Sequence, residues 1–444
     1  MIRFIRILWI LLAGAAFAVT SFNPVVRAAD SAGVRQLSLK ESIGLALKRN
    51  PTIRLAQMNF QSAYANNGIV GSGFYPQIQT SLTYTRATAN YAPTVGIPSS
   101  ASGSTENDTN YPNYGAALSL SQLLFDFGQL NAQFRSAQKN AESADADRQT
   151  AEATLILNVK QAYFGLLQAI QIEQVDEETV RQMEKHLEQA EGFFKVGSKP
   201  KFDVTKAQVD LTNARLTLIK GKNDVQIARV SLNNALGLPV ESQIEPVDAL
   251  KYVQSEVGLE ESQKKAMERR PELMSVRLKK MSGEYSLNHA RDLHYPTLSA
   301  NGAYSYRNSD FPLVHNWSVG VSLNIPIFSG FQIVREVDQA EANVEALSAQ
   351  EEIQIQNILL EVQQAFLNVK AADEQYGTSE LVVKQAAENL DLAEGRYKAG
   401  VGTAIETTDA EVSLSNAKTT AVQALYNLNV AIAQLQKAIG MENE

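Results

Sequence analysis

The stretch "VGVSLNIPIFSGF" (Val319–Phe331) decides the fold, because hydrophobic residues alternate along it with small or polar ones. Val321 and Leu323 fall on one side of an extended strand, whereas Ser322 and Asn324 fall on the other. A strand with one hydrophobic face needs a hydrophobic partner to cover that face. The rest of the chain consists mainly of long helical patterns, so few other strands are available to do so.

The chain contains the same unit twice, and the quoted stretch belongs to the second copy. The matching segments are "YPQIQTSLTYTR" (75–86) with "YPTLSANGAYSYR" (295–307), "NYGAALSLSQLLFDFGQ" (113–129) with "NWSVGVSLNIPIFSGFQ" (316–332), and "AEGFFKVG" (190–197) with "AEGRYKAG" (393–400). We therefore predict an internal tandem repeat, with a first unit at 29–238, a linker at 239–258 and a second unit at 259–441.

Each unit contains two alternating segments, separated in the first unit by a loop at 87–112 that is rich in Ser, Thr, Asn, Gly and Pro. The four predicted strands span about 74–86, 113–125, 295–307 and 316–328. Each has the length of a strand that crosses a bilayer at a tilt, and Tyr84, Tyr304, Tyr306 and Trp317 would suit a membrane interface. The same alternation also fits a soluble hairpin packed on helices. Four strands cannot close a barrel alone, so strands that span lipid must be shared between several chains.

Two long helical hairpins are predicted, at about 129–237 and 332–440. Small and apolar residues recur at alternating spacings of three and four from Val204 to Ala235, and again from Thr407 to Ala438. Two such positions in every seven residues form the narrow seam of a coiled coil. The first helix of each hairpin is long enough to reach on the order of 100 Å, which suits a tube or stalk.

Tight turns are expected to join the two helices of each hairpin. Gly197 and Gly400 fit the helix C-cap, and Asp203 and Thr403 are predicted to begin the following helices. The predicted fold class is therefore mainly α with a small β part. Each unit would run strand, loop, strand, then a long helical hairpin.

The first residues have the pattern of a secretory signal peptide. Arg3 and Arg6 precede an apolar run at Ile7–Phe17, and small residues allow cleavage after Ala28, so residues 1–28 are excluded from the fold. The 444-residue chain has a formal net charge of −8, which argues against a nucleic-acid partner. It contains no cysteine, which excludes disulfides, thiolate zinc sites and a Cys nucleophile.

No constellation of residues points to an enzyme, a metal site or a cofactor. The histidines are scattered, and His289 and His294 are five residues apart, off any shared helix face. No phosphate-binding glycine loop or nucleophile elbow is present. We therefore predict a protein without catalytic activity.

The doubled pattern resembles the TolC family of outer-membrane channel-tunnel proteins over the whole mature chain. The segments that carry the resemblance are "ESIGLALKRNP" (41–51), Tyr75-Pro76, Tyr295-Pro296, "SLSQLLFDFGQ" (119–129), "SLNIPIFSGFQ" (322–332), "FKVGSKPKFDV" (194–204) and "YKAGVGTAIETTDAE" (397–411). The resemblance implies a homotrimer in the outer membrane of a Gram-negative bacterium. Its four strands per chain would form one twelve-stranded transmembrane β-barrel, continued into the periplasm by a long coiled-coil α-barrel.

The resemblance also implies an acidic periplasmic aperture. In the family, acidic residues near the second tip narrow the entrance, and Glu406 and Asp409 match those positions. Three residues apart, they share one helix face, and three chains would gather six carboxylates that attract cations. The alternative is that carboxylates in the first turns of a helix simply complement its dipole.

Closure and docking residues follow from the same resemblance. Asp203 and Tyr397 match partners that close the aperture in the family, whereas Gly402 stands where the channel that names the family has Arg. The first tip carries three lysines, Lys199, Lys201 and Lys206. They could reach Glu406 or Asp409 in place of that Arg, or they could simply be solvated. The family's docking points for a periplasmic adaptor are matched here by Val196, Gly197, Ser198, Ala399, Gly400 and Val401. The alternative is that these residues serve only as helix caps.

The implied function is a passive exit duct in the outer membrane, coupled to a periplasmic adaptor and an inner-membrane transporter in a tripartite efflux system. An exit channel for type I protein secretion is the alternative within the family. A periplasmic coiled-coil adaptor is an alternative of another class, but it would carry one hairpin and would not need paired strands. A catalytic periplasmic protein is disfavoured by the lack of a site.

Overall fold

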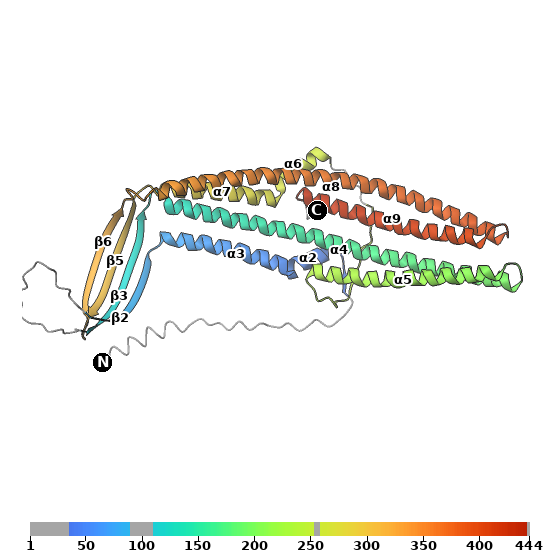
Figure 1. Ribbon diagram of the computed structural model, residues 1–444, viewed down its shortest axis with the longest axis horizontal. Coiled ribbons are helices and arrows are strands. Elements are labelled where there is room, and N and C mark those ends of the chain that lie inside the picture. Colours follow the sequence, from blue (N-terminus) through green and yellow to red (C-terminus); the bar gives the residue numbers. More distant parts are fainter. Residues whose placement is uncertain (1–34, 89–109, 253–257, 442–444) are drawn as a thin grey trace, which may run out of the picture.

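The computed structural model describes residues 35–88, 110–252 and 258–441. The chain is elongated, with a small sheet at one end and the tips of two helical hairpins at the other (Figure 1). The predicted signal peptide at 1–28 and most of the predicted loop at 87–112 lie outside the described residues.

The sheet contains four antiparallel strands in the order β2-β3-β5-β6. These strands are β2 (Gln77–Thr88), β3 (Asn110–Phe125), β5 (Thr297–Asn308) and β6 (Val314–Asn324). The central pair joins β3 from the first half of the chain to β5 from the second half, with Tyr114 opposite Asn308. Within the described residues, β2 and β6 each have a neighbouring strand on one side only.

The strand β3 begins at Asn110 rather than near residue 113, so part of the predicted loop at 87–112 is strand. Two other boundaries differ from the prediction for local reasons. β6 ends at Asn324 rather than near residue 328, because Pro326 has no N–H to donate to a ladder. β2 begins at Gln77 rather than at residue 74, because Ser72–Phe74 form a 3-10 turn, η1. Both strands therefore start or stop where the backbone cannot pair with its neighbour.

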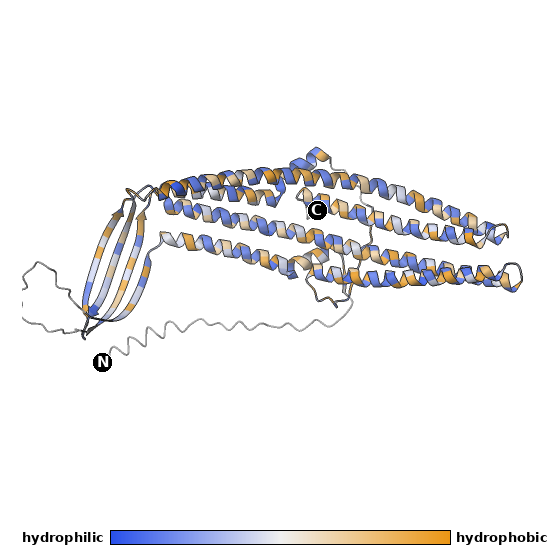
Figure 2. Ribbon diagram, in the orientation of Figure 1, coloured by the Kyte–Doolittle hydropathy of each residue, from blue (hydrophilic) through white to orange (hydrophobic). Residues whose placement is uncertain are grey.

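The predicted alternation of side chains is present in the sheet. Figure 2 shows hydrophobic and hydrophilic positions interleaved along the strands. Val319 is 80% exposed, and Val321 and Leu323 on the same side of β6 are exposed as well. On the other side, the hydroxyls of Ser299 and Ser322 lie 2.9 Å apart. One hydrophobic face of the sheet is thus uncovered in the single chain.

Helices make up most of the described chain, which confirms the predicted mainly α class. They are α2 (Leu39–Arg49), α3 (Pro51–Gly71), α4 (Gln129–Lys195), α5 (Lys201–Leu236), α6 (Leu259–Arg269), α7 (Pro271–Asp292), α8 (Gln332–Lys398) and α9 (Ala404–Ala438). Helices α4 and α8 have 67 residues each, so each extends about 100 Å. Among the described residues, no helix has the length and hydropathy needed to span a membrane.

The predicted seams are the buried faces of α5 and α9. Ala207, Leu211 and Leu232 of α5 are buried, and on α9 every seam position from Thr407 to Ala438 is buried. Alanine at alternate seam positions allows the paired helices to approach closely, so α5 and α9 pack along their length on the longer helices α4 and α8. The boundary prediction at Asp203 is wrong, because α5 begins two residues earlier, after Pro200 at its N-cap. Proline fits this position because the first backbone N–H groups of a helix have no acceptor within the helix, so the missing N–H of Pro200 costs no helical hydrogen bond.

A core at mid-length ties the first hairpin to the chain segments around it. The two short strands β1 (Arg35–Leu37) and β4 (Ile244–Pro246) pair in parallel, and β4 lies inside the predicted linker at 239–258. The hydroxyl of the fully buried Tyr163 of α4 lies 3.0 Å from the Leu37 carbonyl of β1 and 2.9 Å from Asp248, and its one proton can be donated to either oxygen. The linker is therefore fastened to the helices, and residues 253–257 lie outside the described chain.

Two glycines at helix ends, Gly197 and Gly237, have similar backbone angles but differ in how closely other residues pack against them. Gly237 has a φ of 69°, and a Cβ there would lie 2.8 Å from the Cα of Asn50, whereas Gly197 has a φ of 73° with nothing within 4 Å. Gly197→Ala should therefore lower stability by about 1 kcal/mol from backbone strain alone. Gly237→Ala should lower the thermal unfolding midpoint further, because main chain must also move. Equal midpoints for the two variants would contradict this packing.

Candidate functional site

The two hairpin tips have the same backbone geometry, which the glycine positions of the sequence predict. After α4, the N–H of Ser198 donates to the carbonyl of Phe193 at 2.9 Å, and Gly197 adopts a positive φ. After α8, the N–H of Val401 donates to the carbonyl of Arg396 at 3.1 Å, with Gly400 in the left-handed region. Both tips are thus Schellman-type ends that satisfy the last helix carbonyls.

The six residues predicted for docking are all exposed at these tips. Val196 is 77% exposed and Val401 is 72% exposed, so each tip presents a hydrophobic side chain to solvent. The tip residues therefore cap the helices and are exposed at the same time, because Gly197 and Gly400 form the turns while Val196 and Val401 point into solvent. The caps therefore leave these side chains free for a partner.

The two tips contact each other within one chain. The ammonium group of Lys199 in the first tip donates to the carbonyl of Gly402 in the second tip at 3.3 Å. The same ammonium group lies 5.1 Å from the ring centroid of Tyr397, a cation–π arrangement. The ring of Tyr397, which is 1% exposed, also packs against His186 and Phe193 of α4. At the tips, one aromatic side chain and one lysine thus connect the second hairpin to the first.

The predicted closure residues Asp203 and Tyr397 come together, but not through a direct bond. Both side chains are buried, and burial followed by the charge of Asp203 raises the pKa of Tyr397. Among the described residues, the Tyr397 hydroxyl has no hydrogen-bond partner. Gly402 is buried beside them, and a Cβ there would lie 2.9 Å from the backbone nitrogen of Tyr397. This tip therefore has no room for a side chain at position 402.

The predicted aperture residues Glu406 and Asp409 are both exposed at the start of α9. The backbone N–H of Glu406 donates to the hydroxyl of Thr403, which confirms Thr403 as the N-cap. The Glu406 carboxylate lies 3.5 Å from the guanidinium of Arg396. Asp409 points into a different environment, a groove between α8 and α9. The two carboxylates thus share a helix end, as expected from their spacing, but have different neighbours.

Two of the three lysines considered as partners for these carboxylates bind elsewhere, and the third, Lys201, is exposed. Lys199 contacts Gly402, as described above, and Lys206 pairs with Asp210 one helical turn away at 2.5 Å. Arg396, which the sequence did not single out, supplies the positive charge next to Glu406 instead. Its role depends on the course of the tip turn, which brings the end of α8 back beside the start of α9.

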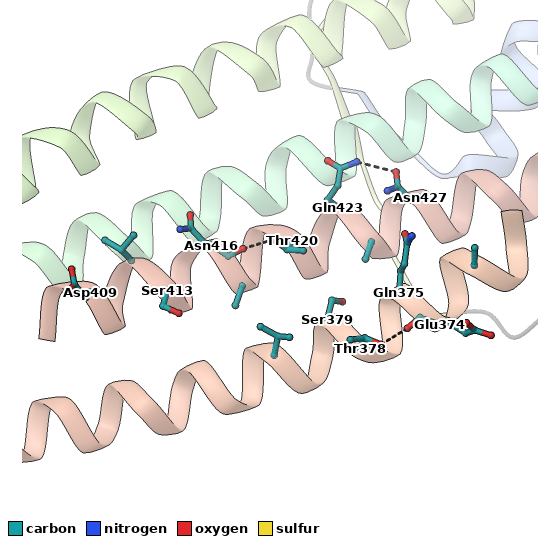
Figure 3. Close-up of a pocket in the computed structure, with 15 residues that line it drawn as sticks. Glu374, Gln375, Thr378, Ser379, Asp409, Ser413, Asn416, Thr420, Gln423 and Asn427 are labelled. Atoms are coloured by element: carbon teal, nitrogen blue, oxygen red, sulfur yellow. Dashed lines mark hydrogen bonds between the residues drawn. The ribbon is translucent and has the colours of Figure 1, made fainter. Parts of the chain in front are cut away.

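A groove of about 1100 Å³ runs between α8 and α9 from Asp409 toward mid-length. Figure 3 shows the side chains that line it, and the labelled polar ones include Gln375, Thr378, Asn416 and Gln423. Thr420 and Thr378 donate to main-chain carbonyls of their own helices, so these hydroxyls are already satisfied. The groove is long and open, and polar side chains alternate in its lining with apolar ones such as Val382 and Val412. This shape suits contact with water or with an extended partner rather than capture of a small molecule.

A buried polar cluster near the second tip has no counterpart in the predicted site. Glu411 of α9 is 4% exposed, and its Oε2 atom lacks a hydrogen-bond partner among the described residues. The hydroxyls of Thr407 and Thr408 are buried in the same way, and His186 of α4 is buried nearby against Tyr397. A polar residue at the Thr407 seam position was the one signal of this cluster in the sequence.

Metal-ligand geometry is missing from the part of the chain that the structure describes, where no group of three or more His, Cys, Asp or Glu side chains could hold an ion. His289 bonds the main chain of Gln129 at 3.0 Å, and His294 bonds the main chain of Arg291 at 3.2 Å. These two histidines, considered above as a pair, thus have separate structural partners.

Comparison with known proteins identifies what the chain is similar to. The family model described as "Outer membrane efflux protein" matches residues 42–238 and 263–441. Outer membrane protein TolC of Escherichia coli strain K12 is 25% identical over 453 residues, covering 95% of this chain and 86% of that protein. Cation efflux system protein CusC of the same strain is 24% identical over 436 residues, covering 95% and 92%.

Solved structures show the same fold. The Campylobacter jejuni CmeC outer membrane channel superposes with a TM-score of 0.78 at 20% sequence identity, covering 91% of this chain and 87% of that one. The described arrangement of one small sheet and two long hairpins is therefore the arrangement of a known channel fold.

The role of Tyr397 can be separated into ring and hydroxyl. Because the hydroxyl has no partner while the ring packs on three side chains, Tyr397→Phe should leave the tips as they are. Tyr397→Ala should loosen them, since truncating a buried aromatic side chain costs about 3–5 kcal/mol. Hydrogen exchange of the amides at 196–200 and 399–403 measures this, with faster exchange expected only for Tyr397→Ala. Equal acceleration in both variants would instead assign the closure to the hydroxyl.

Proposed function

The chain belongs to the outer membrane efflux protein family, and we propose that three copies of it form one passive channel-tunnel across the outer membrane and periplasm. The family assignment confirms the resemblance expected from the sequence. The chain is accordingly an outer-membrane exit duct of an efflux system and not an enzyme. The trimer, the barrel and the partners named below are proposals.

The observation that supports the proposed trimer is that the four-stranded sheet is open at both edges. Strands β2 and β6 each leave one edge without a neighbour in the described chain, and the Val319 side of β6 is exposed. In lipid, every unpaired backbone N–H or C=O is unfavourable by several kcal/mol, so an open edge is not viable there. Pairing β6 of one chain with β2 of the next removes all edges. Three chains with four strands each give twelve strands, within the range of transmembrane barrels.

The helices support the same assembly, because their outer faces are also left uncovered. Leu216, Ile219 and Ile227 of α5 are exposed, as are Leu360 and Leu367 of α8. Repeated exposed hydrophobic side chains along a helix mark a contact surface. In a trimer these faces would meet the hairpins of the adjacent chains and continue the barrel as a hollow tube of helices.

The internal repeat fits this assembly as well. The order helix, helix, strand, strand, long helix, helix occurs in the first half from α2 to α5 and again from α6 to α9. We propose that 29–238 and 259–441 are two copies of one unit. Three chains would then approximate six such units around the axis, each with one strand pair and one hairpin.

The tips are where partners would bind. The exposed residues Val196–Ser198 and Ala399–Val401 suit docking of a periplasmic adaptor, and an inner-membrane transporter would supply the energy. The duct itself is passive in this proposal. Glu406 and Asp409 would ring the entrance, with Asp203 and Tyr397 holding it closed until the adaptor acts.

Deleting the gene tests the function in the cell. The deletion strain should become sensitive to transported compounds, while unchanged drug sensitivity together with lost secreted proteins would instead favour the type I secretion role. Val196→Asp combined with Val401→Asp provides the matched variant, because both side chains are exposed and a charge there spares the fold. This variant should fail to complement the deletion and still conduct ions in a lipid bilayer. Full complementation would remove the tips from the docking role.

The acidic entrance predicts cation selectivity. Replacing Glu406 and Asp409 with Ala should lower the cation-to-anion permeability ratio several-fold in single-channel recordings, because rings of carboxylates select cations. The matched control is the exchange of Glu406→Asp with Asp409→Glu, which keeps both charges and should keep the selectivity. Unchanged selectivity in the Ala variant would mean that these residues do not line the entrance.

A further inference from the structure

The carboxyl group of Glu411 is buried about two turns into α9, near charged groups of α5 and α8. Two other carboxylates repel it, Glu394 from α8 and Asp210 from α5. Each of these already has its own cation, since Lys398 lies 2.8 Å from Glu394 and Lys206 lies 2.5 Å from Asp210. Glu411 therefore has two like charges as neighbours and no cation of its own among the described residues.

The fourth helix adds no positive charge to this cluster. His186 of α4 is 4% exposed, and burial lowers its pKa, so it favours the neutral form at neutral pH. The charged groups that act on His186 are Asp210, Asp203, Glu394 and Lys206. On α9 itself, the hydroxyls of Thr407 and Thr408 are uncharged, and neither has a hydrogen-bond partner in the described part of the chain. A carboxyl group surrounded in this way is stable when it carries a proton and unstable when it is ionised.

We propose that Glu411 is a proton-controlled latch between the two hairpins of each chain. With its proton, Glu411 packs between them and keeps the second tip against the first. Without its proton, the carboxylate favours separation of the tips, because only separation returns it to water. The latch rests on the proposed function, in which the tips surround the entrance of the duct.

The direction of the pH dependence follows from the change in the pKa of Glu411. Burial, then Glu394 and Asp210, raise this pKa from 4.5 to about 7 in the packed tips. The packed state is therefore fully favoured below pH 4.5 and loses this advantage as the pH rises to about 7. If separation hydrates Glu411 completely, the equilibrium shifts toward separated tips by on the order of a hundredfold.

His186 acts in the opposite direction and must be distinguished from Glu411. Because its pKa is lowered from 6.5, its contribution favours packed tips at high pH and is lost as the pH falls below 6.5. The net profile of the wild type therefore combines two opposing titrations. The difference between the wild type and a Glu411 variant isolates the latch.

The test measures the distance between the tips in the full chain reconstituted in lipid. Spin labels on Val196→Cys and Val401→Cys, which are exposed positions in a chain without native cysteine, report the separated fraction from pH 4.5 to 8.5. Glu411→Gln mimics the protonated group and cannot ionise. Relative to Glu411→Gln, the wild type should gain separated tips with rising pH, by on the order of a hundredfold in the equilibrium constant. The control Glu388→Gln, an exposed carboxyl group on α8, should behave as the wild type.

If Glu411→Gln misfolds, a second variant can still disprove the proposed latch. Asp210→Asn removes one repelling charge and releases Lys206, so the transition of Glu411 should move to lower pH. The latch is wrong if wild type and Glu411→Gln share one pH profile, or if Asp210→Asn leaves the transition in place. Bilayer conductance is recorded in parallel. A wild-type protein that never conducts ions would overturn the proposed duct. The measured distances between the tips would still show whether Glu411 acts as a latch.

Discussion

The structure depends on one constraint, which is that backbone polar groups in lipid must be hydrogen-bonded. The sheet at one end of the chain has four strands, with the hydrophobic row of Val319, Val321 and Leu323 on one edge strand and no further strand beside it among the described residues. A sheet of this size is too narrow to close on itself. Everything else in the proposed assembly follows from resolving this edge, including the number of chains, the central pore and the radial placement of the hairpins.

In the proposed assembly, the helical end solves a different problem, which is to extend a narrow tube over about 100 Å with few bulky side chains. Alanine-rich seams let α4 pack closely with α5 and α8 with α9, while mid-length anchors such as Tyr163 fix the hairpins to the linker. The two hairpins also contact each other through polar pairs away from the tips, such as Thr179 with Ser415 and Glu178 with Lys418. Nearer the tips, the buried residues Tyr397 and Glu411 lie at the proposed movable part of the chain.

The sequence predicted what depends on periodicity and local turns, and it missed what depends on which side chains meet. Alternation located the strands, and Gly197 and Gly400 located the tips. The end of β6 and the start of α5 were misplaced because the prolines at 326 and 200 outweigh the patterns around them. Arg396 and Glu411 were overlooked, because the ion pair of one and the burial of the other arise only when helices distant in sequence pack together. Asp203 and Tyr397 were found by resemblance alone.

Strand pairing between chains is the central claim, and disulfide trapping tests it most directly. One cysteine replaces Ser81 in β2, and a second replaces Asn316, Ser318 or Gly320 in turn on β6, in a chain that has no native cysteine. Within one chain β2 and β6 are separated by two strands, roughly 14 Å, which exceeds the reach of a disulfide. The account predicts that oxidation in the membrane gives covalently linked dimers and trimers on a denaturing gel. A chain that inserts into the membrane yet gives only monomers at every register would contradict it.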